Sequence, residues 1–267
     1  MSESNSTTDA GSLQDSFISH LIELRDRLVK VLGLFGVIFA ISFFWPTWSR
    51  IYTLFAKPLM AALPAGGQMI STDIVSVFLV PMKISALASF LVMLPFALYQ
   101  LWAFVAPGLY QHEKRLVIPL VFSSTVLFFV GMAFAYFLIF PMVFKFMASV
   151  APEGVAWMTD IDKYFGFALS MFLVFGFTFE VPVIVVVLVR MNIVTVQKLA
   201  ELRPYMVVVA FVLGAIFTPP DVVSQLALAI PLCILYEIGI IAAKIIGRSK
   251  AGDTPSARSE DAVKKPE

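Results

Sequence analysis

The chain has 267 residues, of which 60% are hydrophobic and only 14% charged, and its mean hydropathy is +0.90. Because a soluble domain is about 45–50% apolar and about 25% charged, this composition excludes an ordinary soluble enzyme and a disordered protein, and it indicates a multi-pass membrane protein. The net charge of +1 offers no basic surface for nucleic acid, and one cysteine with two histidines predicts neither a disulfide nor a metal centre.

The first 16 residues are polar and form an expected N-terminal tail. They carry acidic residues but no Lys or Arg, whereas a cleavable signal peptide starts with a positive region. Phe17, Leu21, Leu24 and Leu28 then recur at helical spacing. This pattern predicts an amphipathic helix that lies at the inner membrane surface and runs into the first span.

Residues 17–247 are expected to form one all-α transmembrane domain with six spans. Each apolar segment is compared with the roughly 20 residues that cross a bilayer. The expected spans are residues 28–46, 77–98, 116–140, 164–189, 205–217 and 222–246. The third is expected to stop at Pro141. Residues 47–76 should pack as a cap on the outer face, and residues 248–267 are predicted to be a disordered cytoplasmic tail.

The fifth span is short. At 1.5 Å per residue its 13 residues extend about 20 Å, against a hydrocarbon core of about 30 Å. We expect both the fifth and the sixth span to be short. We therefore expect locally thinned lipid beside these two helices. With the N-terminus inside, fourteen of the 19 Lys and Arg residues fall on the cytoplasmic side. The basic C-terminal segment favours an inside C-terminus too, and therefore an even number of spans.

No motif for bond chemistry is present. The sequence lacks a phosphate-binding P-loop, a dinucleotide fingerprint, a zinc-protease motif and a nucleophile elbow. We therefore expect a protein that is not an enzyme, needs no cofactor, and draws energy from a partner or the membrane potential.

One acidic residue lies deep in an expected span. Glu180, in Phe179-Glu-Val-Pro182, is about 13 Å from the inner end of the fourth span. A charge at this depth costs about 3 kcal/mol on insertion scales, so the side chain should face protein or a water-filled cavity. A structural carboxyl is the alternative, but the position favours a functional role.

Two carboxylates are expected at the inner surface. Taken singly, Glu23 could pair with Arg27 four residues later, and Glu113 with the basic residues that follow it. Together they could accept a ligand that carries two guanidinium groups. The aromatic loop before Glu113, which includes Phe104, is either an interfacial belt or a docking surface.

Further polar residues lie near the ends of the last spans. Gln225, Thr218 and Ser224 form a small patch that could bond a neighbouring helix, although capping by Thr218 and Asp221 is an alternative. Three charged residues close to span ends are expected only to extend to the interface: Lys83, Glu237 and Lys244.

Several of these motifs, in consistent order from about residue 19 to residue 244, resemble one known family. The segments that carry the resemblance are Ser19-His-Leu-Ile-Glu-Leu-Arg-Asp-Arg-Leu28, the loop from Tyr99 to Arg115, Ala151-Pro-Glu-Gly154, Phe179-Glu-Val-Pro182 and Phe217-Thr-Pro-Pro-Asp-Val222. They are similar to the TatC family, the large subunit of the twin-arginine protein translocase.

The resemblance implies six helices in a curved, cupped bundle in the bacterial inner membrane, with both termini cytoplasmic. It implies binding of twin-arginine signal peptides of folded cargo, recruitment of small single-span subunits of the TatA and TatB type, self-association in a larger complex, and transport driven by the proton-motive force. The signal-peptide contacts it implies are Glu23, Glu113, Arg25 and Phe104. It assigns Glu180 to an intramembrane groove, and Gln225 and Thr218 to partner docking.

Two other functions are compatible with the residues alone. A proton-coupled small-solute permease would use Glu180 as its proton carrier. A structural scaffold for membrane assembly would need neither Glu23 nor Glu113 for export.

Overall fold

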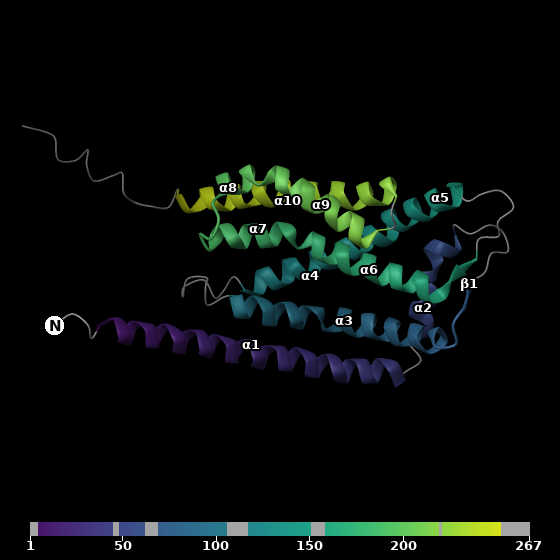
Figure 1. Cartoon of the computed structure of the whole chain (residues 1–267), viewed down its shortest axis with the longest axis horizontal. Helices are drawn as coiled ribbons and strands as arrows, with labels where there is room; N and C mark the ends of the chain where they lie inside the picture. The colour runs from purple at the N-terminus through teal and green to yellow at the C-terminus, as the bar shows by residue number, and fades with distance from the viewer. Residues whose placement is uncertain are drawn as a thin grey trace, which may run out of the picture. The chain divides into compact units, whose positions relative to one another are not determined.

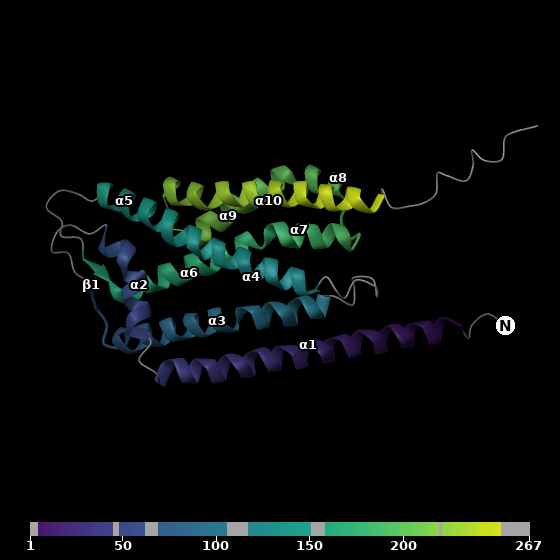
Figure 2. The same cartoon turned by 180° about the vertical axis from the view of Figure 1, so that it is seen from behind.

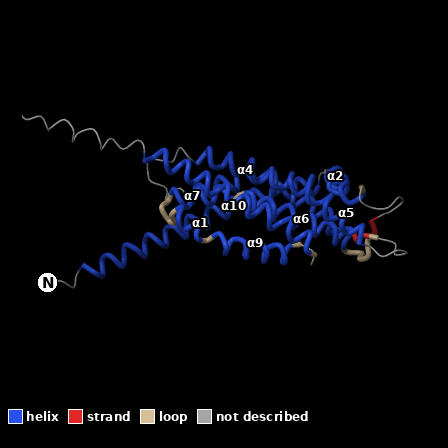
Figure 3. The backbone as a smooth tube through the Cα atoms, turned by 90° about the horizontal axis from the view of Figure 1, so that it is seen from above, coloured by secondary structure: helices blue, strands red, loops and turns tan. Residues whose placement is uncertain are grey.

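In the computed structural model of the chain, residues 5–44, 48–61, 69–105, 117–150, 158–218 and 221–251 are described. These parts are almost entirely helical (Figure 1), and the strands in them are confined to one short pair (Figure 3). The chain divides into two compact units, residues 1–177 and residues 178–267. Each unit is described by itself below.

The first unit begins with α1 (Asn5–Phe44), a helix of 40 residues. It runs without a break from the predicted amphipathic segment into the first span, and it lies beside α3 (Ser76–Val105) in both views of the fold (Figures 1 and 2). The apolar stripe of the amphipathic segment is exposed at Leu21, Leu24 and Leu28, whereas Glu23 and Arg27 are half-buried. The polar face of this segment therefore turns toward protein.

Helix α2 (Trp48–Met60) lies within the segment predicted to form a cap. Two tyrosine hydroxyls hold it: Tyr136 Oη donates to the carbonyl oxygen of Leu54 at 2.7 Å, and Tyr164 Oη donates to that of Phe55. Within a helix the Leu54 carbonyl would accept from the residue four positions later, which is Pro58 and has no N–H. Tyr136 supplies the donor that proline lacks.

The third apolar segment folds as α4 (Val117–Phe134), a π-helical turn labelled η3 (Ala135–Ile139) and α5 (Phe140–Val150). The sequence predicted that this span stops at Pro141, but the helix continues through it. In a π turn the hydrogen bonds run over five residues, as from the Phe140 N–H to the Ala135 carbonyl. The π turn lies directly before Pro141. Because proline has no N–H, a regular α-helix would lose one backbone hydrogen bond at this position in any case.

A dense aromatic core fills the first unit. Its largest fully buried side chains are Phe128, Phe140, Phe165, Phe172 and Phe175. These rings pack in tilted and edge-to-face pairs, such as Phe140 with Phe172 at a centroid distance of 5.1 Å, which is the arrangement that aromatic quadrupoles favour.

The strands β1 (Met69–Ile70) and β2 (Thr159–Asp160) pair in parallel just before α6 (Ile161–Phe179). The Asp160 carboxylate accepts hydrogen bonds from the hydroxyl and the N–H of Thr72, and from the N–H groups of Asp162 and Lys163 at the start of α6. These bonds, that of the Thr72 hydroxyl first, lower the pKa of Asp160 to about 2. One carboxylate thus caps α6 and ties it to the segment after β1.

The second unit contains α7 (Val181–Arg190), α8 (Val196–Glu201), α9 (Arg203–Phe217) and α10 (Val222–Ala251). Val185, Leu199, Tyr236 and Ile240 form one buried cluster. The hydroxyl of Tyr236 donates to the Leu199 carbonyl at 2.8 Å, which satisfies a buried acceptor.

Two charged residues that were expected only to extend to the interface are held in ion pairs instead. Lys83 Nζ lies 2.6 Å from Asp162 Oδ1, and Arg203 forms a bidentate pair with Glu237 at 2.6 and 2.8 Å. Both partners are distant in sequence, so helix periodicity could not reveal them.

Among the described residues, five helices are long and apolar enough to cross a membrane: Ile18–Phe44, Ser76–Val105, Val117–Val150, Ile161–Arg190 and Val222–Ile246. The predicted class, a helical membrane protein, is confirmed. Helix α9 is shorter, with 15 residues, so a count of six spans stays a prediction. The expectation of a short sixth span is wrong, because α10 has 30 residues and continues through Pro231.

Candidate functional site

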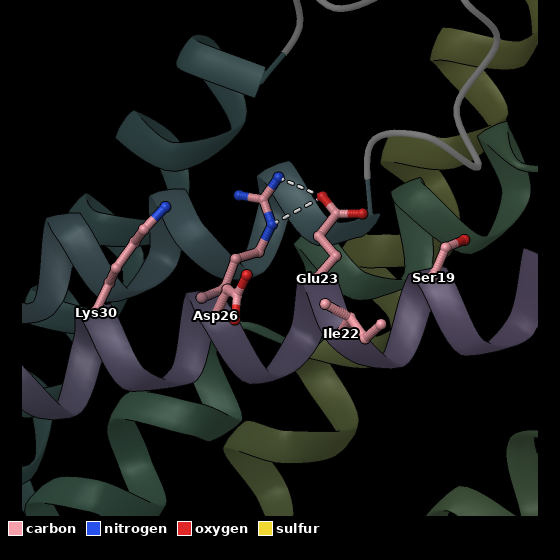
Figure 4. Close-up of a pocket in the computed structure, with 6 residues that line it drawn as sticks. Ser19, Ile22, Glu23, Asp26 and Lys30 are labelled. Atoms are coloured by element: carbon pink, nitrogen blue, oxygen red, sulfur yellow. Dashed lines mark hydrogen bonds and ion pairs between the residues drawn. The ribbon is translucent and has the colours of Figure 1, made fainter.

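The predicted carboxylate at the inner end of α1 is already bound to a guanidinium group. Arg27 donates to Glu23 Oε1 from Nε at 3.0 Å and from Nη2 at 2.6 Å (Figure 4). The four-residue spacing places both side chains on one helical face, so the predicted local pair is confirmed. The second oxygen of Glu23 points away from Arg27 (Figure 4).

Arg27 also links α1 to α3. Its Nη1 donates to Oε1 of Gln100 at 3.0 Å, and its side chain is 23% exposed against 37% for Glu23. The guanidinium is therefore fixed from two helices, and it orients the Glu23 carboxylate. Sequence analysis missed Gln100, because no periodic signal relates residues 73 positions apart.

An aromatic pair lies beside the free side of the carboxylate. The ring of His20 stacks on that of Phe104 with centroids 4.1 Å apart and an interplanar angle of 13°. His20 Nδ1 is 3.7 Å from Glu23 Oε2, too far for a hydrogen bond. Phe104 and Glu23, both predicted site residues, are thus brought together through His20. Sequence reasoning could have identified His20 as a neighbour of Glu23 from their three-residue spacing, which places both side chains on one helical face.

Glu23 and Arg27 border a shallow pocket of about 370 Å³ on α1, whose lining residues are Ser19, Ile22, Glu23, Asp26, Arg27 and Lys30 (Figure 4). Arg25, another predicted contact, does not line this pocket. It is 70% exposed and donates to Asp26 Oδ1 at 2.8 Å. Glu113 lies outside the described residues. The pocket offers a carboxylate oxygen among mixed charges, a set that suits binding of a cation.

Among the described residues there is no group of three or more His, Cys, Asp or Glu that could hold a metal ion.

In the second unit, Glu180 is 5% exposed and lies between α6 and α7. Pro182 follows in the first turn of α7, where a missing N–H is tolerated. The carbonyl oxygen of Glu180 accepts from the N–H of Ile184 at 3.0 Å, so the helical path resumes at once. The deep acid predicted from sequence is therefore buried at a break in the helix rather than within a regular turn.

The two predicted docking residues both hydrogen-bond to α9. Gln225 Nε2 donates to the Phe211 carbonyl at 2.9 Å, and Thr218 Oγ1 donates to the Gly214 carbonyl at 2.7 Å. A Cβ atom at Gly214 would lie 2.9 Å from Cγ of Gln225, so α9 and α10 are in direct contact here. The expected cap by Asp221 is present, since its Oδ1 accepts from the Ser224 N–H at 2.7 Å.

The family described as Sec-independent protein translocase protein (TatC) matches residues 19–231 of the chain. The chain belongs to the TatC family. It is 48% identical over 231 residues to the TatC protein of Escherichia coli strain K12, covering 86% of the chain and 89% of that relative. It is 48% identical over 227 residues to that of Haemophilus influenzae, covering 85% and 88%.

Identity to the TatC protein of Halothiobacillus neapolitanus is 45% over 245 residues, which is 92% of the chain but 66% of that longer relative. A solved structure titled Twin Arginine Translocase Receptor TatC superposes with a TM-score of 0.76 at 35% identity, covering 86% of the chain and all of that structure.

These findings confirm the resemblance seen in the sequence. A TatC protein is a component of Sec-independent protein translocation, and the chain is a multi-pass membrane protein of this kind. Nothing in the comparisons supports the permease alternative.

Proposed function

We propose that the chain is the receptor subunit of the twin-arginine translocase in a bacterial inner membrane, with both termini cytoplasmic, and that the Glu23 pocket receives an arginine of the signal peptide. The solved TatC structure named a translocase receptor supports this role. The proposed ligands are the paired arginines of folded precursor proteins, and neither nucleic acid nor a cofactor takes part.

The observation that carries the proposal is the geometry of Glu23. Its Oε1 accepts two hydrogen bonds from one guanidinium, while its Oε2 points away from these bonds (Figure 4). A carboxylate can accept four such bonds, and charge-assisted bonds are roughly twice as strong as neutral ones. Arg27 therefore holds the carboxylate in place and leaves one oxygen for a second guanidinium.

The aromatic pair gives the same site a preference for arginine over lysine. A planar guanidinium that binds Oε2 can also stack on the exposed ring of His20, which rests on Phe104. A lysine ammonium has no plane to stack. Glu113 is proposed as the carboxylate for the other arginine, and Arg25 as a neighbouring contact of the signal peptide.

We further propose that the small single-span subunits, of the TatA and TatB type, dock along α9 and the start of α10 near Gln225 and Thr218. Most of α9 is apolar and exposed in the second unit, including Tyr205, Val208 and Ile216. The Gln225 amide has two N–H donors and one acceptor oxygen, more than its bond to Phe211 uses, so it can also bond a polar side chain of a single-span helix inside lipid. Self-association into a larger complex is part of the proposal.

Glu180 is proposed to contact the apolar part of the signal peptide within the membrane. The mechanism is binding and not bond chemistry, and the proton-motive force supplies the energy for transport. Burial of an acid at a helix break supports a role beyond packing.

The test is photocrosslinking in membranes with a probe residue at Ile22, which lines the pocket. A signal peptide with Arg-Arg should crosslink strongly, and a Lys-Lys version should lose most of the signal. A probe at Val37, which is exposed farther along α1, is the control and should crosslink weakly with both. Equal crosslinking of the two peptides at Ile22 would reduce the pocket to a generic acidic surface.

A further inference from the structure

A second cavity lies in the first unit, away from the Glu23 pocket. It measures about 400 Å³ and is bordered by α1, α3 and α6 through residues such as Phe35, Phe90 and Phe177. Of the described residues that line it, Lys83 alone carries a charge. We propose that this groove binds one phospholipid, with an acyl chain along the groove and the phosphate at Lys83.

The length of the groove matches half a bilayer. Along α3 its lining runs from Lys83 to Phe90, and along α6 from Leu169 to Phe177, which at 1.5 Å per residue is about 10 and 12 Å. Half of the hydrocarbon core is about 15 Å. A charged side chain is stable near the headgroups and costly at the centre, so Lys83 marks the headgroup end and Phe90 the midplane end.

The lining of the groove suits an acyl chain. Apart from Lys83, its described lining residues are Phe, Leu and Ala, whose side chains offer dispersion contacts and no hydrogen-bonding group. A flexible hydrocarbon chain can follow such a groove, and only its phosphate needs a polar partner, which Lys83 provides at one end.

Lys83 can bind a phosphate without breaking its ion pair. Its Nζ lies 2.6 Å from Asp162 Oδ1, and its side chain is 34% exposed. An ammonium group has three N–H donors, so Asp162 uses one and the others are available to phosphate oxygens. The neighbouring Asp162 carboxylate can meet a cationic headgroup, so a zwitterionic lipid such as phosphatidylethanolamine fits both charges. With the proposed topology, the lipid belongs to the outer leaflet.

The experiment uses the full chain in vesicles of phosphatidylethanolamine and phosphatidylglycerol. A phosphatidylethanolamine probe carries a diazirine near the middle of one acyl chain, and labelled residues are mapped by mass spectrometry after irradiation. We expect labelling of the segment from Ala86 to Phe90 to exceed labelling of the exposed residues Val37 and Ile41 by about fivefold. Uniform labelling of these helices would overturn the proposal.

Two variants sharpen the result. Ala86→Phe places a ring in the groove and should reduce its labelling about fivefold, whereas Ala40→Phe, on the exposed face of α1, should leave it unchanged. If Ala86→Phe does not fold, the labelling pattern of the unmodified chain still tests the proposal. Loss of labelling when an Arg-Arg signal peptide is added would assign the groove to the peptide and contradict the lipid. Neither the labelling map nor the two variants involve the Glu23 pocket. A negative result would therefore contradict the lipid proposal and leave the receptor proposal unaffected.

Discussion

Replacing Gly176 by alanine should destabilise the protein through one identifiable contact. A Cβ atom at this position of α6 would lie 2.6 Å from Cε2 and 2.7 Å from Cε1 of Phe128, and closer still to Cζ. Carbon atoms pack best at about 3.5–4.0 Å, so the ring would have to move by about 1 Å. Phe128 is fully buried between Phe90 and Phe177, at centroid distances of 5.9 and 5.5 Å, which leaves little room for that movement.

The expected cost follows from overpacking, which destabilises cores by about 1–3 kcal/mol. Alanine also gains up to about 1 kcal/mol of helix propensity over glycine. Gly166, on the same helix, has nothing within 4 Å of an added Cβ and isolates that gain. The free energy of unfolding of Gly176→Ala should therefore fall below that of Gly166→Ala by about 1–3 kcal/mol.

The assay is equilibrium unfolding of the purified protein in detergent micelles for Gly166→Ala, Gly176→Ala, Phe128→Leu and the Gly176→Ala/Phe128→Leu double variant. Because Leu is shorter than Phe, the double variant should be more stable than the sum of the two single effects by at least about 1 kcal/mol. Equal stability of the two glycine variants, with no coupling to Phe128, would refute the packing argument.

Three other predictions concern the site, a buried hydroxyl and pH. Arg27→Lys keeps a charge but loses the planar contact with Glu23, so signal-peptide affinity measured by titration should fall by no more than about fivefold. Tyr236→Phe leaves a buried carbonyl of α8 without its donor and should cost about 1–2 kcal/mol in the same unfolding assay. The lowered pKa of Asp160 means that its contribution to stability is complete above the usual value of 3.8 and is lost as the pH falls toward 2, so the melting temperature should drop over this window, and less steeply in Thr72→Val.

Hydropathy predicted most of the membrane helices because an apolar run is a local property of the sequence. The segments around α3, α6 with α7, and α10 all lie where the sequence placed spans. Proline misled the expected boundary at Pro141, because the π turn before it lets the helix continue despite the missing donor. Helix α8 has only six residues, too few for a periodic signal.

The site was predictable only in its local parts. The pair of Glu23 and Arg27 follows from their spacing on one helix. The link from Arg27 to Gln100 and the stack of His20 on Phe104 depend on how α1 lies against α3, which no pattern within a single helix specifies. Only the family resemblance connected Phe104 with Glu23 before the structure did.

The π turn between α4 and α5 carries a consequence for the evolution of this segment. A π turn corresponds to one residue inserted into an α-helix, and each residue rotates a helix by about 100°. Deleting one residue between Phe134 and Phe140 would restore a regular helix and rotate all of α5. Phe140 and Phe144 would leave their partners Phe172 and Tyr164, at 5.1 and 5.7 Å. Among relatives, a change in length here should therefore occur only together with substitutions of these aromatic residues.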